Sequence, residues 1–388
     1  GEFVGPAARV AVTPIVPPAT LGVLGGGQLG RYFVMAAATM GYRTMVLDPD
    51  PSAPAGAVAH EHLVAPYDDP ASLRRLSFDC DVVTTEFENP PAAALDELAV
   101  AVVVAPSPSS VRIAQDRIAE KAFLADNGFP IGPYMVLPST DDPPIDSKVV
   151  DAGAIVKTAR LGYDGKGQRS VDGVAETLAA WAELGGGPCV VERRLDLDTE
   201  LSVIVARTAD GRIDAWPVAE NRHVDGILDL TVVPAAVSPK LADRAVGLAM
   251  AIADALDYVG VLAVELFVVD GDLLVNELAP RPHNSGHWTL DACVTSQFEQ
   301  QVRAVCGLGL GSTAMTVPSV AMVNLLGDLW QHGSPDWSVA FGDPAAKLHL
   351  YGKGQARPGR KMGHLTVTSD VSTAAAARAL ELRSAVVR

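Results

Sequence analysis

Glu265 and Glu277 stand in two apolar, β-type runs that flank a hairpin signal, Asp270-Gly271-Asp272. A three-residue loop at 270–272 places the two glutamates opposite each other on one face, whereas a two-residue loop separates them unless a bulge intervenes. Adjacent carboxylates in apolar surroundings repel each other, and a hard divalent cation offsets that repulsion. The pair therefore predicts a Mg²⁺ site, with an ordinary hairpin carrying one exposed glutamate as the alternative.

Further polar groups follow this pair. Asn276 adds an oxygen beside Glu277, and residues 279–287 (APRPHNSGH) place cationic and polar side chains in a segment that its prolines keep from forming regular helix. A loop this dense in donors at a strand end indicates ligand binding.

A phosphate-binding loop is predicted after the β-type run 154–157. Lys157 ends the run, and residues 162–168 (GYDGKGQ) then supply three glycines and Lys166. Glycine backbone and ammonium groups can close over a triphosphate without side-chain clash. The alternative is a solvated hairpin tip.

Two more glutamates border β-type runs nearby. Glu192 ends the run 189–192, and Glu200 opens the run 201–206. An edge strand here would offer backbone groups to an adenine, and Glu200 would accept ribose hydroxyls. Both glutamates would otherwise be surface residues of an edge strand.

The N-terminal pattern predicts a Rossmann-like domain. The apolar run 21–24 leads into glycines at 25–30 and a helix over 31–39, an order that holds phosphate on backbone N–H groups. Asp48 ends the next strand, where a dinucleotide fold keeps its ribose-binding acid. Binding of NAD stays open, because Gly25, Gly27 and Gly30 meet its spacing, but other doubly wound domains use the same turn for a mononucleotide phosphate or for tight packing.

Two other polar clusters allow two interpretations each. Glu86 and Asn89 follow the strand that begins at Asp81, and they either bind a substrate or cap the helix begun at Pro91. The basic residues between 351 and 364 form either an anion pocket or a solvated charge cluster.

Composition limits the class of protein. About half of the 388 residues are apolar, enough for two or three domains, and 46 acidic against 30 basic side chains give a charge of −16. This charge argues against nucleic-acid and anionic-membrane partners. No apolar run reaches membrane length. Four widely spaced cysteines predict reduced thiols in a cytoplasmic protein: Cys80, Cys189, Cys293 and Cys306.

Helices are expected over 110–125, 174–184, 241–256 and 290–306. A boundary is expected near the Pro- and Asp-rich stretch 130–147. Residues 1–19 are expected to be a disordered or expression-derived lead.

Five motifs in this order resemble the 5-(carboxyamino)imidazole ribonucleotide synthases of the ATP-grasp superfamily. They are GGGQLGR at 25–31, EFENP at 86–90, GYDGKGQ at 162–168, NELAPRPHNSGHWT at 276–289, and YGK with RPGRKMGH at 351–364. The resemblance implies an α/β protein: an N-terminal Rossmann-like (preATP-grasp) domain at 20–115, an ATP-grasp domain at 116–310 with a lid at 134–195, and a small β-rich C-terminal domain at 311–388.

The same resemblance implies an activity and its participants. The enzyme would use ATP, Mg²⁺ (or Mn²⁺) and bicarbonate to carboxylate aminoimidazole ribonucleotide through carboxyphosphate, and would form a homodimer. The implied metal ligands are Glu265 and Glu277. The implied catalytic residues are Lys157, Tyr163, Lys166, Arg281 and Asp164, of which Asp164 is the hypothetical base, with released phosphate as the alternative.

The implied ATP contacts are Arg112, Lys157, Tyr163, Asp164, Gly165, Lys166, Gly167, Gln168, Glu192, Arg193, Arg194, Leu195, Glu200, His223, Asn276 and Glu277. The implied ribonucleotide contacts are Gly27, Gln28, Leu29, Glu86, Asn89, Tyr163, Lys166, Asn284, Ser285, Lys353, Arg360 and Lys361.

Three other functions compete with this interpretation. Another ATP-grasp ligase, such as a formate-using transformylase or a biotin carboxylase, does not account for RPGRKMGH and NSGHWT. An NAD-dependent oxidoreductase leaves the lysine loop and the paired glutamates unexplained. A nucleotide sensor without turnover has no need of Lys157, Glu265 and Glu277.

Overall fold

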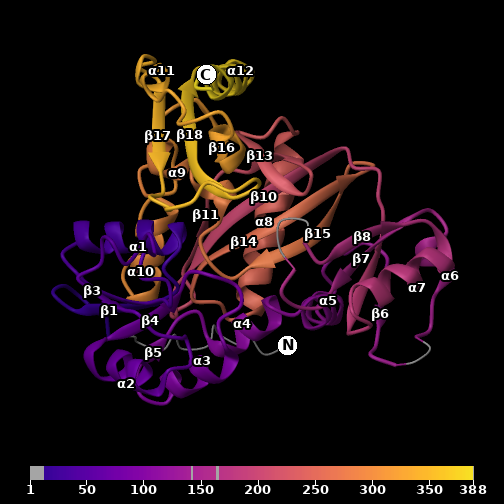
Figure 1. Cartoon of the computed structure of the whole chain (residues 1–388), viewed down its shortest axis with the longest axis horizontal. Coiled ribbons are helices and arrows are strands. Elements are labelled where there is room, and N and C mark those ends of the chain that lie inside the picture. Colours follow the sequence, from indigo (N-terminus) through magenta and orange to yellow (C-terminus); the bar gives the residue numbers. More distant parts are fainter. Residues whose placement is uncertain (1–12, 141–142, 163–165, 388) are drawn as a thin grey trace, which may run out of the picture.

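A broad antiparallel sheet forms the centre of the molecule, with a parallel sheet on one side and a small separate sheet on the other (Figure 1). The computed structural model describes residues 13–140, 143–162 and 166–387. The predicted roles of Tyr163, Asp164 and Gly165 therefore concern residues outside the described part, as does most of the predicted lead. Within the described part, no helix is both long and apolar enough to span a bilayer.

The N-terminal sheet is parallel throughout and confirms the Rossmann-like prediction. Its strands, in pairing order, are β3 (Glu61–Leu63), β2 (Arg43–Leu47), β1 (Thr20–Leu24), β4 (Val82–Thr85) and β5 (Val103–Val104). Its helices are α1 (Gln28–Thr39), α2 (Pro70–Asp79), α3 (Ala92–Ala99) and α4 (Pro108–Ala114). The chain order reverses between β1 and β4, and open α/β sheets bind ligands at the carboxyl ends of such neighbouring strands.

The central sheet has nine strands and crosses the expected boundary at 310/311 without a break. In order they are β15 (Asp272–Ala279), β14 (Gly260–Val269), β10 (Thr199–Arg207), β12 (Ala219–Val224), β13 (Ile227–Val233), β16 (Ser319–Leu326), β18 (Lys361–Ser369) and β17 (Ala346–Leu350), with β11 (Ile213–Ala215) paired to β10. Because β13 pairs with β16, the C-terminal strands extend the ATP-grasp sheet rather than forming a sheet of their own.

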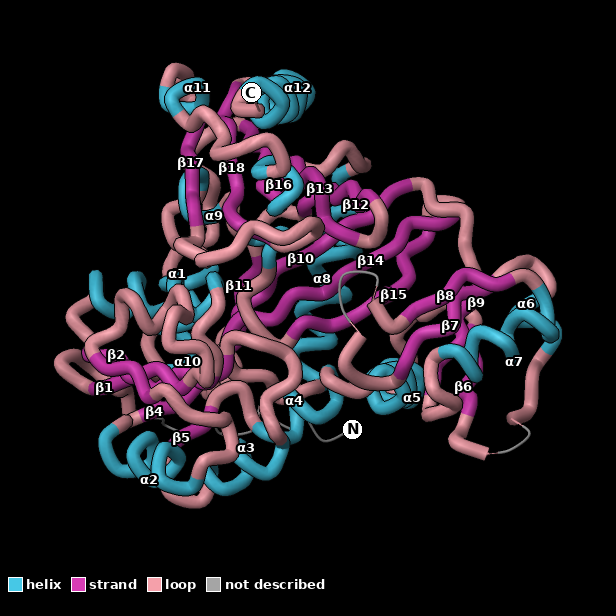
Figure 2. Tube along the Cα trace, in the orientation of Figure 1, coloured by secondary structure: helices cyan, strands magenta, loops and turns pink. Residues whose placement is uncertain are grey.

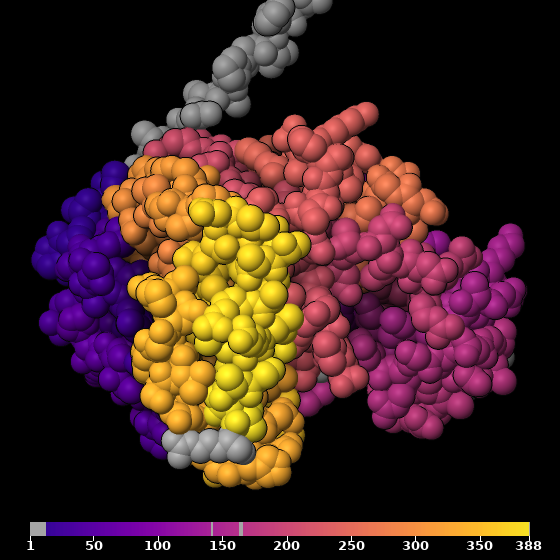
Figure 3. Space-filling model, turned by 90° about the horizontal axis from the view of Figure 1, so that it is seen from above, coloured from indigo at the N-terminus to yellow at the C-terminus, as the bar shows by residue number. Residues whose placement is uncertain are grey.

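The small sheet lies in the region expected to be the lid. Its strands are β6 (Tyr134–Leu137), β9 (Cys189–Arg193), β7 (Ala154–Thr158) and β8 (Gln168–Val171), covered by α6 (Ser147–Val150) and α7 (Gly173–Glu183). It stands beside the edge strand β15 (Figure 2), and a recess separates it from the rest of the molecule in the space-filling view (Figure 3).

The remaining helices pack on the central sheet or join it to the N-terminal sheet. They are α5 (Arg117–Asp126), α8 (Pro239–Ala255), α9 (Thr289–Ala292), α10 (Gln297–Val305), α11 (Ser338–Phe341) and α12 (Ser372–Ala385), with 3-10 turns η1 (Asn284–Gly286) and η2 (Gly327–Trp330). In α8, Ala245, Ala249 and Ile252 recur at helical spacing and pack against the sheet.

Three expectations need correction. The helix expected over 110–125 breaks into α4 and α5, because the Asp116 carboxylate caps α5 by accepting from the N–H groups of Ile118 and Ala119. The helix expected over 290–306 is likewise interrupted before α10, where Cys293 is extended and Ser296 is the N-cap.

The third correction concerns the lead. Ile15 packs in the N-terminal core, its N–H donates to the Cys306 carbonyl at 2.9 Å, and its carbonyl accepts from the Tyr42 hydroxyl at 2.7 Å. Disorder is therefore wrong for residues 13–19. All four cysteines are free thiols, as expected.

Candidate active site

The hairpin places Glu265 and Glu277 directly opposite each other. Its loop has two residues, Asp270 and Gly271, both with positive φ, and a register shift beside Glu265 leaves Asn276 as the extra residue. The bulge therefore restores the pairing that a two-residue loop alone would have lost.

The oxygen atoms of this group suit Mg²⁺. Asn276 Oδ1 is buried and has no hydrogen-bond partner among the described residues. Glu277 lies 2.9 Å from Arg117 Nη1, and Glu265 lies 3.1 Å from His283 Nε2. Burial raises the pKa of Glu277, but Arg117 and Lys157 outweigh it and hold the pKa at about 2. Two opposed carboxylates beside an unsatisfied amide oxygen are a donor set that a hard cation favours.

A chain of charges connects the lid to this hairpin. Lys157, on β7, donates to Glu192 of β9 at 3.0 Å. Lys121, on α5, lies 3.5 Å from the other oxygen of Glu192 and donates to the Asn276 carbonyl at 2.9 Å. Burial raises the pKa of Glu192, yet Lys157 and Lys121 bring it below its usual value.

Arg112 is not at this site. Its guanidinium is about half exposed and pairs with Asp96 at 2.9 Å. Arg117 instead faces Glu277 and lines a cleft with Asn89 and Gly162. The helix break at Asp116 causes the difference, because it turns α5 toward the hairpin and leaves Arg112 on α4.

Sequence reasoning missed Arg117, Glu120 and Lys121, which α5 carries toward the site. Glu120 is buried, accepts from the Leu278 N–H, and has its pKa raised to about 8 by burial. Their spacing in the sequence could have identified them, because charged residues at i, i+3 and i+4 lie on one face of a helix.

Glu86 holds the glycine turn. Its carboxylate accepts from the N–H groups of Gly27 and Gly30, each at 3.0 Å, and therefore caps α1. The interpretation of Glu86 or Asn89 as caps of α3 is wrong, because that helix has no side-chain cap. Gln28 begins α1 and Leu29 is buried beside it.

Asp48 does not stand free for a ribose. Its carboxylate accepts from the Gly26 N–H at 2.6 Å and from the Tyr67 hydroxyl at 2.7 Å. Both hydrogen bonds hold the glycine turn in its packed position. The NAD interpretation therefore lacks the ribose-binding carboxylate that it assigned to Asp48.

Glu192 lies on β9 and Glu200 lies on β10, and both strands are internal to their sheets. The expectation of an edge strand is therefore wrong for both glutamates. Glu200 pairs with His223 Nδ1 across β10 and β12 at 2.5 Å. Burial lowers the pKa of His223, but Glu200 and Glu265 raise it overall. Beyond β9, Arg194 pairs with Asp172 at 3.0 Å.

The remaining predicted ATP contacts lie on or next to the strands of the small sheet. Arg193 reaches the Lys148 carbonyl, and Leu195 follows β9 half-buried. Lys157 of β7 lies opposite Gln168 of β8, and Gly167 has φ +72°. Lys166 lies just before Gly167.

The donor-rich segment 279–287 lies in the protein interior. Asn284 is buried, and neither atom of its amide has a hydrogen-bond partner among the described residues. Ser285 Oγ lies 2.8 Å from Ser202 Oγ. Arg281 pairs with Glu88 of the EFENP loop.

The basic cluster sits in the loop between β17 and β18. Lys353 donates to the Lys361 carbonyl at 2.8 Å, and Arg360 donates to the Gln355 carbonyl at 2.8 Å. Lys361 begins β18. The loop and the start of β18 thus carry the three predicted phosphate-binding cations.

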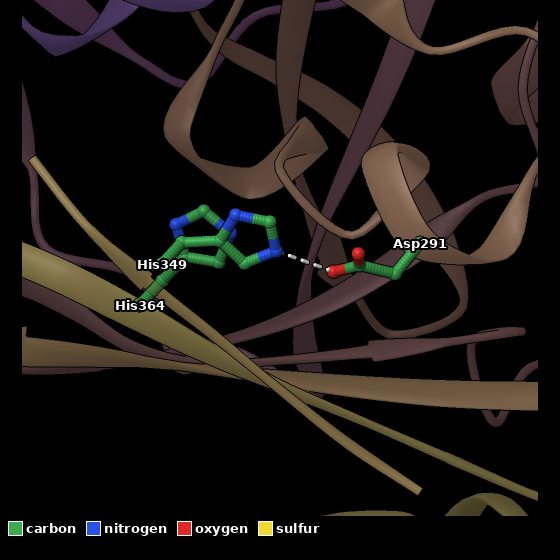
Figure 4. Close-up of side chains that lie close together, drawn as sticks. All are labelled: Asp291, His349 and His364. Atoms are coloured by element: carbon green, nitrogen blue, oxygen red, sulfur yellow. Dashed lines mark hydrogen bonds and ion pairs between the residues drawn. The ribbon is translucent and has the colours of Figure 1, made fainter. Parts of the chain in front are cut away.

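A histidine cluster joins the C-terminal strands to the rest. His349 and His364 are cross-strand partners, and Asp291 of α9 points toward them, 2.8 Å from His349 Nε2 (Figure 4). Their rings are stacked at 4.3 Å with planes 13° apart. Imidazoles bind metals through lone pairs in the ring plane, so these rings would have to rotate before sharing an ion. His287 and Tyr32 continue the packing, and burial lowers the pKa of His287 and His364.

Three family models match successive parts of the chain. They are the ribonucleotide synthetase preATP-grasp domain at 18–115, the ATP-grasp domain at 122–298, and the phosphoribosylaminoimidazole carboxylase C-terminal domain at 320–378. Fold and site together thus define an ATP-grasp ligase.

Curated relatives make the assignment narrower. The N5-carboxyaminoimidazole ribonucleotide synthase of Brucella melitensis is 45% identical over 91% of this chain and 97% of its own length. The Bacillus subtilis synthase is 43% identical over 91% of this chain and 92% of its own. The chain belongs to the N5-carboxyaminoimidazole ribonucleotide synthase family.

Solved structures of such synthases are similar to this chain along nearly its whole length. The Thermus thermophilus synthetase superposes with a TM-score of 0.87 at 40% identity, covering 95% of this chain and 98% of that one. The Aspergillus clavatus synthase in complex with ADP and 5-aminoimidazole ribonucleotide gives 0.85 at 31% identity, covering 95% and 98%.

Proposed function

We propose that the chain uses ATP and bicarbonate to carboxylate 5-aminoimidazole ribonucleotide on its exocyclic amine, releasing ADP and phosphate. The product is 5-carboxyaminoimidazole ribonucleotide, a precursor in de novo purine biosynthesis. One observation carries the proposal: a single cleft is lined by the EFENP loop, α5, the lid end of β7 and the carboxylate strand β15. The proposal is supported because Asn89, Arg117 and Glu277, proposed contacts of the ribonucleotide, ATP and the metal, border the same cleft.

ATP would lie between the lid and the hairpin. Lys157 and Arg117 would contact its phosphates, and Arg117 would take the role that the resemblance assigned to Arg112; their ion pairs with Glu192 and Glu277 support this. The chain after Glu192 would hold the adenine, and Glu200 with His223 the ribose. The loop 162–168 would close over the phosphates.

Glu265 and Glu277, with Asn276 beside them, would hold Mg²⁺, a role that Mn²⁺ can also fill. Once bound, the ion supplies positive charge at the phosphoryl oxygens.

Bicarbonate is a poor electrophile, so one of its oxygens first attacks the γ-phosphoryl group of ATP. The resulting carboxyphosphate is short-lived in water and requires a closed lid. It then delivers its carboxyl group to the amine of the imidazole. In this scheme the chain contributes chiefly positioning and charge from Lys157, Lys166 and Arg281.

The ribonucleotide would lie against the N-terminal sheet. Gly27, Gln28 and Leu29 present the N-terminal end of α1, and the basic loop of Lys353, Arg360 and Lys361 would bind its phosphate. The other proposed contacts are Glu86, Asn89, Tyr163, Lys166, Asn284 and Ser285. Of these, Glu86 would act through the glycine turn that it holds.

A base must remove the amine proton, and we assign this to Asp164 because it lies on the closing loop. Asp164→Asn should lower kcat at least about 100-fold while ATP binding persists. Normal turnover in that variant would pass the role to released phosphate.

Labelled bicarbonate tests the function directly. The chain should convert it to an acid-labile product bound to the ribonucleotide, only when ATP is present and with one ADP formed per label fixed. Label fixed on biotin and none on the ribonucleotide, or ADP formation that requires formate in place of bicarbonate, would move the chain to another ATP-grasp ligase.

We also propose a cytoplasmic homodimer without nucleic-acid or membrane partners. The net charge of −16 supports the exclusion of polyanions. Light scattering that gives the mass of one chain would contradict the dimer.

A further inference from the structure

Lys121 is a buried cation to which the proposed reaction assigns no role. Its side chain is 3% exposed, and its ammonium group has two neighbours, the Asn276 carbonyl at 2.9 Å and Glu192 Oε1 at 3.5 Å. An ammonium removed from water is costly and is retained where charged partners offset that cost. Here the partners belong to the ATP site.

Glu192 is divided between two lysines. Its Oε2 accepts from Lys157 at 3.0 Å, whereas Oε1 faces Lys121 and has no hydrogen-bond partner among the described residues. The carboxylate is 13% exposed and lies on β9, inside the lid sheet. One oxygen thus keeps a free position for an N–H donor from a ligand.

The charge balance explains why two lysines are present. Lys157 with Glu192 alone would be a closed neutral pair, and the phosphates of ATP would have to break it. With Lys121 the group holds two cations for one anion, so Glu192 stays fixed from one side when Lys157 turns to phosphate. Lys121 is itself fixed to β15 through the Asn276 carbonyl.

We propose that Lys121 is a positioning residue for nucleotide selection. It holds Glu192 so that Oε1 accepts a hydrogen bond from the adenine amino group, and it leaves Lys157 available to the phosphates. Guanine carries a carbonyl where adenine carries this amine, so a carboxylate fixed here favours ATP over GTP. The inference rests on the ATP site of the proposed function.

Equilibrium binding of ATP and GTP to the full chain, without ribonucleotide or bicarbonate, tests the role. Lys121→Met should weaken ATP binding about tenfold or more and GTP binding much less. Lys121→Arg should recover part of the preference, because it restores the charge. Lys240→Met, at an exposed position in α8, is the matched control and should equal wild type.

A double-mutant cycle separates positioning from general damage. Glu192→Gln should lose the preference for ATP, and adding Lys121→Met should cost little more. Equal loss of ATP and GTP binding in Lys121→Met, or additive losses in the double variant, would overturn the role. If Lys121→Met does not fold, Lys121→Arg and Lys121→Gln carry the same comparison. Failure of the proposed reaction would appear elsewhere, as wild-type ADP release that ignores the ribonucleotide.

Discussion

At the scale of residues, the site is a set of charges held in internal pairs. Arg117 pairs with Glu277 and Lys157 pairs with Glu192, while His283 Nε2 lies 3.1 Å from Glu265. Buried charges are stable only when paired, so the chain supplies its own partners where nucleotide and metal would otherwise do so. Under the proposed function, binding of ATP and Mg²⁺ would be an exchange of partners rather than the filling of an apolar pocket.

This exchange of ion-pair partners predicts that substitutions of Arg117 and Arg112 affect ATP use differently. Arg117→Met removes the partner of half-buried Glu277 together with a proposed contact to the ATP phosphates, and losing a charge-assisted hydrogen bond of this kind costs up to about 3 kcal/mol. The kcat/KM for ATP should therefore fall about 100-fold. Arg112→Met removes only an exposed pair with Asp96 and should change kcat/KM less than about fivefold. The measurement is the steady-state kcat/KM for ATP of both variants. Equal losses in the two variants would show that Arg112 also acts at the ATP site.

Glu120 predicts a dependence of stability on pH. Burial raises its pKa to about 8, against about 4.3 in an unfolded chain. Between these values the folded chain keeps a proton that the unfolded chain has lost, so stability falls as pH rises, by up to about 1.4 kcal/mol per unit. Glu120→Gln should remove this slope in urea denaturation at pH 5 and pH 8. Exposed Glu97→Gln is the control, and a slope unchanged in Glu120→Gln refutes the account.

Residues differ in how far the sequence could predict them. Glu265 and Glu277 were predictable because a carboxylate is conspicuous in an apolar strand. Arg117 and Lys121 were not, because charges on a helix resemble a solvated face until its neighbours are known. The direction in which their side chains point depends on the break between α4 and α5 at Asp116. This break results from hydrogen bonds to the Asp116 side chain, which the spacing of hydrophobic residues does not predict.

At the scale of elements, the turn before α1 shows how one glutamate shapes the N-terminal end of a helix. Gly27 and Gly30 donate to Glu86, which reaches across from the end of β4. A Cβ on Gly27 would lie 2.8 Å from Glu86 Oε1. Glycine is required there because the carboxylate approaches the backbone closely.

Gly27→Ala should therefore displace Glu86. We expect a raised KM for the ribonucleotide, unchanged ATP binding, and a loss of about 1–3 kcal/mol in the free energy of unfolding. Gly247→Ala on exposed α8, where an added Cβ meets nothing within 4 Å, should instead stabilise by up to about 1 kcal/mol. Kinetics and urea denaturation of both variants are the measurements. A Gly27→Ala enzyme with a normal KM would show that Glu86 does not shape the substrate site.

Element boundaries were predicted less well than element types. The glutamate hairpin has the two-residue loop that would have separated its carboxylates, and the bulge at Asn276 reunites them. A bulge depends on the fit of two whole strands, so a local pattern leaves its position open. The break before α10 is similar, since it follows from a bridge between Cys293 and Met315.

At the scale of the whole molecule, the C-terminal strands are packed against both other regions. The C-terminal strands continue the ATP-grasp sheet through β13 and β16, and stacked histidines tie them to α1 and η1. The ordered motifs were enough to predict the ATP-grasp and Rossmann-like parts. The continuous sheet was not predictable, because β13 and β16 are far apart in the sequence and nothing local specifies their pairing.

The most direct test is ADP release from ATP, Mg²⁺ and bicarbonate, with and without aminoimidazole ribonucleotide. The account predicts release that depends strongly on the ribonucleotide in wild type and is lost in Glu277→Ala. Release at the same rate without the ribonucleotide would contradict the substrate assignment, and full activity in Glu277→Ala would contradict the site.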